Sequence, residues 1–185
     1  MKAVLAGAFG KLGTDILIEL CKQGHEVVAL DLVTKELEGY TYTAKKIDVT
    51  KPETLAGTMD GADVVISTVG LTGTSATITN YDIDLNGNIN LLDEAKKAGV
   101  KNFVYISVIK ADTAPGVPML HAKYLFEEEL KNHNLRDEVT LTGSFCIGRC
   151  NRVGVTVQVD DEIYTGITRE SFNEFLNDKI LAKLK

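Results

Sequence analysis

The sequence predicts an α/β fold, in which a doubly wound, mostly parallel sheet is followed by a C-terminal β-hairpin and helix. Three observations support this prediction. Short apolar runs alternate with segments of helical spacing, a glycine-rich segment directly follows the first apolar run, and the length of 185 residues suits one domain with its own core. Regular alternation of strands and helices is typical of a parallel sheet that is covered on both faces.

Five short apolar runs predict the strands of this sheet. They are Ala3–Ala6, Val27–Leu30, Val64–Ser67, Phe103–Ser107 and the weaker run Val139–Thr142. Each run has the length of a strand, and segments that favour helices or turns separate one run from the next.

Segments of helical spacing connect these runs. In the first, Leu12, Ile16 and Leu20 recur on one face, and Gly24 follows where a C-terminal cap is expected. The other two helices are predicted over Leu85–Ala98, with Gly99 as the stop, and over Lys123–Asn132.

Composition and charge disfavour several classes of protein. The net charge of -6 and the pI near 5.1 disfavour a nucleic-acid or anionic-membrane surface, which normally shows a clustered basic face. Three cysteines, Cys21, Cys146 and Cys150, are too few and too unevenly spaced for a disulfide framework. We find neither a signal-peptide pattern nor an apolar stretch of the roughly 18 residues that span a bilayer. We therefore expect a cytoplasmic protein without nucleic-acid or membrane partners.

The glycine-rich segment "AGAFGKLGTD" carries the first functional signal. Gly7, Gly10 and Gly13 lie between a predicted strand and a predicted helix. In such a unit the first glycine permits the turn, the second lets the backbone approach a pyrophosphate, and the third lets the helix pack on the strand. The N-terminus of the helix then favours the anion. The segment therefore predicts a dinucleotide-binding loop.

Asp31 lies directly after the second predicted strand, 18 positions beyond Gly13. A carboxylate there can accept a hydrogen bond from the adenine ribose 2′-hydroxyl, although a structural Asp at a strand end is the alternative. A carboxylate also repels a 2′-phosphate, which favours NAD over NADP. Lys11 and Lys35 lie close enough in sequence to weaken that preference.

Five segments give the chain a family resemblance. They are "GAFGKLG", "IDVTKPETL", "GADVVISTVG", "NGNINLLDEAKKAGVKNFVYIS" and "HAKYLFEEEL". In this order they resemble the NmrA-like, NAD(P)-binding branch of the atypical short-chain dehydrogenase/reductase superfamily. The resemblance covers residues 1 to about 130 and implies a Rossmann-like sheet with NAD or NADP as cofactor.

The resemblance also assigns roles to individual residues at the ends of the predicted strands. They are Phe9, Lys11 and Leu12 at the diphosphate turn, Asp48 and Val49 at the adenine, and Thr68, Val69 and Gly70 at the ribose and nicotinamide side. Lys123 matches the lysine that holds the nicotinamide ribose in this superfamily, and a solvated lysine at a helix start is the alternative.

Catalytic residues are harder to assign. Active members of the superfamily carry a Tyr four residues before the Lys, and Met119 stands there in this chain. The Tyr-x-x-x-Lys spacing of Tyr42 and Lys46 lies between the second and third predicted strands, and we interpret it as coincidence.

Three other residues are candidates for catalysis. Ser107 is a candidate to orient a substrate carbonyl, and His121 or Tyr124 to supply acid–base chemistry. For each of these, an ordinary structural role is the alternative.

The last third departs from this family. The segment "LRDEVTLTGSFCIGRCNRVGVTVQVDDEIYTGITRESFNEFLNDKI" resembles the C-terminal half of a thioredoxin-like two-iron two-sulfur ferredoxin. The resemblance implies a hairpin over Val153–Tyr164, a helix over Ser171–Leu184, and Cys146 and Cys150 as a ligand pair. The segment "VQVDDEIYTG" itself predicts a hairpin with Asp160 and Asp161 in its turn. A cluster or a structural zinc needs four ligands, so these two thiols form a half-site only and no metal site is predicted. Cys21 is interpreted as a core residue of the first helix.

The predicted organisation is one Rossmann-like domain over residues 1–185. Residues 1–130 form its dinucleotide-binding part, and residues 131–185 pack on the same sheet. Because the two resemblances meet inside "EEELKNHNLRDE", a recombined or designed chimera is a hypothesis.

Three functions stay open at this point. The first is an NAD(P)-dependent oxidoreductase or epimerase acting on a small molecule. The second is a non-catalytic dinucleotide-binding regulator or scaffold, and the third is an iron–sulfur electron carrier. A homo-oligomer is also left open.

Overall fold

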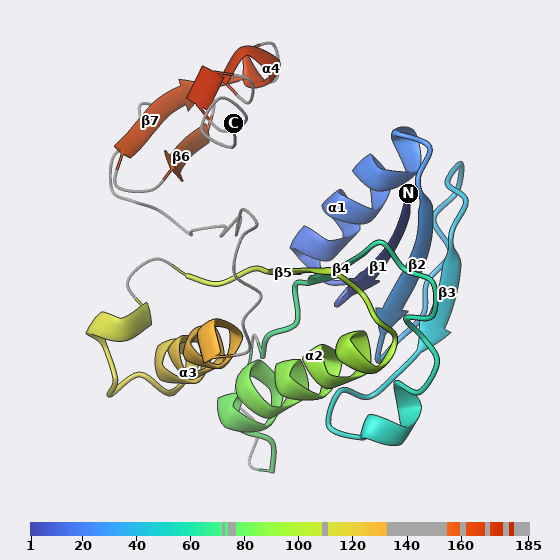
Figure 1. Cartoon of the computed structure of the whole chain (residues 1–185), viewed down its shortest axis with the longest axis vertical. Coiled ribbons are helices and arrows are strands. Elements are labelled where there is room, and N and C mark those ends of the chain that lie inside the picture. Colours follow the sequence, from blue (N-terminus) through green and yellow to red (C-terminus); the bar gives the residue numbers. More distant parts are fainter. Residues whose placement is uncertain are drawn as a thin grey trace. The chain divides into compact units, whose positions relative to one another are not determined.

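The computed structural model of the chain describes residues 1–71, 73, 77–108, 111–132, 155–159, 162–168, 171–175 and 178–179. The chain divides into two compact units, Met1–Gly143 and Ser144–Lys185, and each is described by itself. The predicted parallel sheet lies in the first unit (Figure 1).

The first unit is built on five parallel strands. They are β1 (Lys2–Ala6), β2 (Glu26–Asp31), β3 (Thr43–Lys46), β4 (Val64–Ser67) and β5 (Asn102–Tyr105), in the order β3-β2-β1-β4-β5. Four of the predicted strands are confirmed, although β5 ends two residues earlier than predicted. The fifth predicted run, Val139–Thr142, lies outside the described residues. The strand order reverses between β1 and β4, where open α/β sheets form their ligand crevice.

Strand β3 was not predicted from the sequence. Its four residues, "TAKK", are all exposed, and they pair with β2 from Val28↔Thr43 to Asp31↔Lys46. An edge strand needs no apolar alternation, because only one side of its backbone is paired, and edge lysines hinder pairing with another chain. The periodicity of the sequence therefore does not mark this strand.

Helices connect the parallel strands. They are α1 (Lys11–Lys22), the π-helix η2 (Tyr81–Gly87), α2 (Asn88–Lys97) and α3 (Pro118–Asn132), with short 3-10 turns η1 (Pro52–Thr54) and η3 (Ala111–Thr113). The first predicted helix is confirmed, and Gly24 after it has a φ of 75°. The second begins at Tyr81, four residues earlier than predicted, and its first part is the π-helix. The third begins at Pro118, since proline suits the first turn of a helix, and not at Lys123.

No helix within the described ranges combines the length and the hydropathy that a membrane crossing requires.

The core of this unit lies on both faces of the sheet, as predicted for a doubly wound fold. Alternate residues of β1 and β2 face opposite ways, so that Leu5 packs with Leu17 of α1, whereas Val4 packs with Leu91 of α2. Figure 1 shows α1 and α2 on opposite faces. Helix α3 adds Phe126, which packs with Tyr105 of β5 at a ring-centroid distance of 4.6 Å.

The second unit contains the predicted hairpin. Strands β6 (Val155–Val159) and β7 (Glu162–Ile167) pair antiparallel, and helix α4 (Phe172–Phe175) follows. The rings of Tyr164 and Phe175 pack together with centroids 5.3 Å apart. The predicted turn residues Asp160 and Asp161 and much of the predicted helix Ser171–Leu184 lie outside the described residues. The packing of residues 131–185 on the parallel sheet stays a prediction.

Candidate functional site

The glycine loop follows β1 and is packed so closely that side chains do not fit at two of its positions. Gly7 has a φ of 77°, and a Cβ there would lie 2.6 Å from Thr68 Oγ1. A Cβ at Gly13 would lie 2.0 Å from the carbonyl oxygen of Gly7. The backbone N–H of Gly7 donates to the Leu30 carbonyl (2.9 Å), which joins the loop to the end of β2. The structure thus explains Gly7 and Gly13 by close backbone approach.

The N-terminus of α1 is suited to an anion. Gly10 is its cap residue, without a side chain to occupy the terminus, and the first turn holds no acidic residue. Lys11 and Leu12 are exposed there. The first N–H groups of a helix lack intrahelical acceptors and carry the positive end of the helix dipole, so they bind phosphate oxygens. The diphosphate of a dinucleotide therefore fits this loop.

Asp31 at the end of β2 braces the glycine loop. Its Oδ2 accepts from Phe9 N (2.8 Å) and its Oδ1 accepts from Leu32 N (2.7 Å). The Lys35 ammonium donates to the Phe9 carbonyl (3.0 Å), so both sides of one peptide segment are held. The Phe9 side chain is buried and packs on Tyr42, so Phe9 presents its backbone to the loop. The structural role that the sequence left as an alternative for Asp31 is present, and its ribose role stays a prediction.

The segment after β4 contacts the glycine loop from the other side of the strand reversal. The Thr68 hydroxyl lies within hydrogen-bond distance of the carbonyls of Ala6 (3.1 Å) and Gly7 (3.0 Å). Val69 is buried, and its carbonyl accepts from Asn88 Nδ2 (3.4 Å). Thr68, Val69 and Gly70 therefore lie at the strand reversal, where the resemblance predicts the nicotinamide side, and Thr68 joins them to the predicted diphosphate loop.

Lys123 lies beside Gly70 in a buried polar cluster. Its ammonium forms an ion pair with Asp84 Oδ1 (3.2 Å) and donates to the Tyr105 hydroxyl (3.2 Å). A Cβ at Gly70 would lie 2.8 Å from Asp84 Oδ1 and 3.3 Å from Lys123 Nζ, so glycine makes room for the pair. Lys123 is only 8% exposed, so the alternative of a solvated lysine is wrong.

Tyr105 supplies the phenol next to Lys123, although it does not occupy the expected position. It comes from β5 and is 1% exposed. Burial, with a smaller effect from the charges of Asp84 and Glu127, raises the pKa of Tyr105 far above its usual range. The hydroxyl therefore stays protonated and out of contact with solvent. Met119, at the position of the superfamily tyrosine, is exposed.

Asp48 and Val49 follow β3 and shape a turn. Asp48 Oδ1 accepts from the N–H (3.0 Å) and the hydroxyl (2.7 Å) of Thr50, and Oδ2 pairs with Lys51 (3.3 Å). The hydrogen bond from the Thr50 hydroxyl is the largest cause that lowers the pKa of Asp48. Val49 is buried against Gly87. Contact of these two residues with adenine stays a prediction.

Ser107 and His121 each have a partner within the protein. Ser107 is buried and donates to the Glu127 carboxylate. Burial raises the pKa of Glu127, against the opposing effect of that hydrogen bond. His121 Nδ1 lies 2.9 Å from the Tyr81 hydroxyl, which joins α3 to η2. Tyr124, the other acid–base candidate, is half-buried on α3.

Tyr42 and Lys46 lie at the β3 edge of the sheet, which is the edge opposite to β5. The Tyr42 hydroxyl accepts from Leu37 N and donates to the Lys35 carbonyl, both at 2.8 Å. Its contacts are structural, which agrees with its interpretation as coincidence.

The cysteines form no site that the structure describes. Cys21 is half-buried, its thiol donates to the Thr41 carbonyl (3.4 Å), and burial raises its pKa. Cys146 and Cys150 lie outside the described residues. Within the described ranges, no three His, Cys, Asp or Glu side chains gather as a metal site would require.

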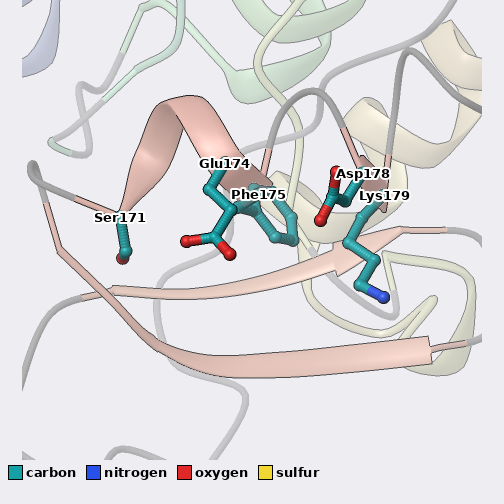
Figure 2. A pocket seen from close by; sticks show the side chains of 5 residues that line it. All are labelled: Ser171, Glu174, Phe175, Asp178 and Lys179. Atoms are coloured by element: carbon teal, nitrogen blue, oxygen red, sulfur yellow. The ribbon is translucent and has the colours of Figure 1, made fainter.

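The second unit has a small surface pocket at α4. Figure 2 shows its lining residues, Ser171, Glu174, Phe175, Asp178 and Lys179. None of them was predicted as a site residue, and the Lys179 ammonium lies 5.9 Å from the Tyr164 ring centroid.

Sequence reasoning missed Asp84 and Tyr105. A weak signal for Asp84 was present: it stands one residue before the second predicted helix, at helical spacing from Asn88, Leu91 and Ala95, which the structure shows to be buried. An acidic residue on an apolar face needs a buried partner. No comparable signal marks Tyr105, which reads as an ordinary strand residue.

Comparison with known proteins agrees with this geometry. The family model described as "NAD(P)H-binding" matches residues 7–145. A photosystem II assembly factor of Synechocystis is 28% identical over 167 residues, which cover 89% of this chain and 51% of that protein. A short-chain dehydrogenase/reductase superfamily protein of Agrobacterium tumefaciens with bound NAD has a TM-score of 0.63 at 20% identity, over 78% of this chain and 48% of that one.

A second solved structure gives the same fold. UDP-glucose 4-epimerase from Bifidobacterium longum, in complex with NAD+ and UDP, has a TM-score of 0.63 at 19% identity, over 78% of this chain and 52% of that one. The chain spans about half the length of the curated relatives it matches first. These matches give the ferredoxin resemblance and the chimera hypothesis no support.

The matched residues 7–145 include the glycine loop, Asp31, the segment after β4 and Lys123. The NmrA-like, Rossmann-like prediction for the first part of the chain is thereby confirmed. This chain belongs to the NAD(P)H-binding family, with a fold of the short-chain dehydrogenase/reductase type and NAD or NADP as its cofactor.

Proposed function

We propose that this chain binds NAD(P) as a regulator or scaffold and does not itself transfer hydride. The observation that carries the proposal is the surroundings of Lys123. The phenol beside it, Tyr105, is 1% exposed, and the exposed position four residues before it is Met119. A proton donor must reach the reacting atom of a substrate, and neither residue offers this.

Two parts of the first unit would hold the cofactor. The backbone of residues 7–13 and the N-terminus of α1 would bind the diphosphate, with Asp31 keeping the loop in shape. Lys123 would hold the nicotinamide ribose, because an ammonium has three N–H donors and its contacts with Asp84 and Tyr105 use two of them. A bound nicotinamide supplies hydride chemistry, and the residues described here supply its position.

The relatives support a role in which binding matters more than turnover. The curated relative from Synechocystis is named for assembly of a photosystem and not for a reaction. We propose that NAD(P) occupancy of this chain regulates a contact with another protein. A cytoplasmic location and a homo-oligomer stay predictions, and one relative from Arabidopsis thaliana is named as chloroplastic.

An oxidoreductase or epimerase acting on a small molecule is the second candidate. The Tyr81–His121 pair favours it, because both residues are half-buried and lie on the helices that supply Asp84 and Lys123. A phenol in contact with an imidazole can donate a proton to a substrate. One relative is named as a 3-beta-hydroxysteroid dehydrogenase and another as a UDP-glucose 4-epimerase, which suggests a hydroxysteroid and a nucleotide sugar as first substrates to test.

The third hypothesis, an iron–sulfur carrier, has only Cys146 and Cys150 for four thiolate positions. A bound iron–sulfur cluster would make the purified protein brown, so a colourless protein would exclude this hypothesis.

Parallel calorimetric titrations with NADH and NADPH test the proposal. We expect binding of both at about micromolar affinity, as is common for nucleotide sites, with NADH the tighter because of the Asp31 charge. Gly10→Glu places a carboxylate at the N-terminus of α1 and should abolish binding, whereas Asp31→Ala should weaken it. Failure of the wild-type chain to bind either dinucleotide would refute the proposal.

Turnover is measured next, by nicotinamide absorbance with the steroid and by product analysis with the nucleotide sugar. We expect none above background. Activity that disappears in Tyr81→Phe would favour the second candidate instead.

A further inference from the structure

Asp84 is the most deeply buried carboxylate of the cluster around Lys123, and it contacts three separate segments. It lies on the π-helix η2 and is fully buried. Its Oδ1 pairs with Lys123 of α3 (3.2 Å), and its Oδ2 accepts from Leu71 N (3.1 Å) and Asn80 Nδ2 (3.0 Å). One carboxylate thus joins η2 to α3 and to the backbone that follows β4.

The backbone of Asp84 is held as well. Its carbonyl accepts from Asn88 Nδ2 (3.0 Å), and the same amide reaches the Val69 carbonyl (3.4 Å). Asn88 Oδ1 accepts from the Ser67 hydroxyl (2.6 Å). The end of β4 and the π-helix are therefore connected by a chain of buried polar contacts, which fixes where the Asp84 carboxylate lies.

A buried carboxylate is costly unless it is paired and hydrogen-bonded, and replacing such a pair by apolar residues is often neutral for stability. Stability alone therefore gives no reason for an Asp at position 84. The position of its partners gives one, because Lys123 and the segment Thr68–Gly70 are the two parts of the site assigned to the nicotinamide side, and Leu71 directly follows that segment. The glycine loop, by contrast, is braced by Asp31 and makes none of its described contacts with Asp84.

We propose that Asp84 is a positioning residue for the nicotinamide half of the dinucleotide. It holds the Lys123 ammonium and the Val69–Leu71 backbone in one arrangement, so that the nicotinamide ribose meets preplaced donors. The adenosine diphosphate half is bound by the glycine loop and does not depend on Asp84. This inference rests on the proposed binding of NAD(P).

Calorimetric titration with two probes separates the halves of the site. NADH contacts both halves, and ADP contacts the glycine-loop half alone. For Asp84→Asn, which keeps the shape of the side chain and removes its charge, we expect about a tenfold loss of NADH affinity and an ADP affinity within about twofold of wild type.

Coupling between the two residues gives an independent readout. Lys123→Met should weaken NADH binding at least as much, because it also removes the donor to the ribose. The double variant Asp84→Asn/Lys123→Met should lose less than the sum of the two single losses, because both single variants break the same ion pair. The double variant has no unpaired buried charge. If Asp84→Asn alone does not fold, the affinities for NADH and ADP are therefore compared in the double variant.

Glu94→Gln is the matched control. Glu94 is another buried carboxylate, on α2, and its Oε1 accepts from Gly57 N (2.7 Å) away from the cluster. We expect its NADH and ADP affinities to equal those of wild type.

Two results would overturn the inference while leaving the proposed function in place. One is wild-type NADH affinity in Asp84→Asn, and the other is an equal loss of NADH and ADP affinity, which indicates a purely structural role. If the wild-type chain bound neither probe, the proposed function itself would fail and the inference with it.

Discussion

Gly13 lies where the first turn of α1 passes the carbonyl of Gly7. A side chain at Gly13 would meet backbone atoms of Gly7 and Ala8, none of which can rotate away. Gly7 adds a second restriction, because its positive φ favours glycine. At the scale of single residues, the dinucleotide loop thus depends on the absence of side chains at Gly7 and Gly13. Substitutions at these positions change the conformation of the loop backbone.

Gly13→Ala should therefore affect both folding and binding. We expect a loss of about 1–3 kcal/mol in the free energy of unfolding, because the added methyl group forces the backbone apart. NADH affinity should fall as well, since the loop and the N-terminus of α1 shift together. Urea unfolding and calorimetric titration measure the two effects.

Gly116→Ala provides the control for this substitution. A Cβ at Gly116 meets no atom within 4 Å, so the free energy of unfolding should stay within about 0.5 kcal/mol of wild type. Equal effects of the two substitutions would contradict the close approach at Gly13.

At the scale of elements, α3 is held to its neighbours by polar pairs as well as by apolar packing. Asp84 pairs with Lys123, Tyr81 contacts His121, and Ser107 donates to Glu127. The first two pairs join α3 to η2. The third joins α3 to the segment that follows β5, and it contains a carboxylate whose pKa is raised by burial.

The raised pKa of Glu127 predicts a pH dependence of stability. The folded chain binds the proton of this carboxyl more tightly than the unfolded chain does, so the stabilisation is fully present below the unfolded pKa and is lost as pH rises through the folded pKa. Relative to Glu127→Gln, the wild-type chain should lose stability as the pH rises above the ordinary carboxyl range of about pH 4. Urea unfolding at several pH values measures this difference.

Glu36→Gln, at an exposed carboxyl, is the control. Its free-energy difference from wild type should change less with pH than that of Glu127→Gln. If the Glu127→Gln difference instead stayed constant as the pH rose, the raised pKa would be wrong.

The elements also show what periodicity can and cannot predict. The buried strands and α1 follow from apolar spacing, because each must present an apolar face to the core. Strand β3 does not, since "TAKK" at the sheet edge is stabilised by pairing with β2 and not by burial. Apolar spacing also does not predict the π-helix at Tyr81, whose residue Asp84 pairs with Lys123 nearly forty residues later.

The residues of the candidate site also differ in whether the sequence alone could predict them. The glycine loop could be predicted because glycine itself is the signal. Lys123 was identified only by resemblance, and its pairing with Asp84 became visible only once the fold had joined η2 to α3. Polar contacts between distant segments have no counterpart in a pattern of neighbouring residues.

At the scale of the whole molecule, the predicted dinucleotide crevice is at the point where the order of the parallel strands reverses, between β1 and β4. Residues from β1, β2, β4 and α3 all meet at the carboxyl ends of these strands. Occupancy of this crevice should therefore stabilise the sheet as a unit and not one loop alone.

NADH at a hundredfold excess over its dissociation constant should raise the free energy of unfolding of the first unit by about 2.7 kcal/mol. Hydrogen exchange should show added protection in β1, β2 and β4. The same measurement tests the predicted single domain, because an equal gain in β6 and β7 indicates one cooperative domain and no gain indicates two. An unchanged exchange rate in β1 would contradict binding at the crevice.

The brace formed by Asp31 has a kinetic consequence. The carboxylate fixes Phe9 and Leu32 through contacts that lie wholly within the protein, and Lys35 fixes the carbonyl of Phe9. The diphosphate thus meets a loop whose shape is already set, which reduces the ordering that association would otherwise require. Stopped-flow mixing should accordingly show one exponential phase whose rate rises linearly with nucleotide concentration, and removal of the brace should add a slower, concentration-independent phase.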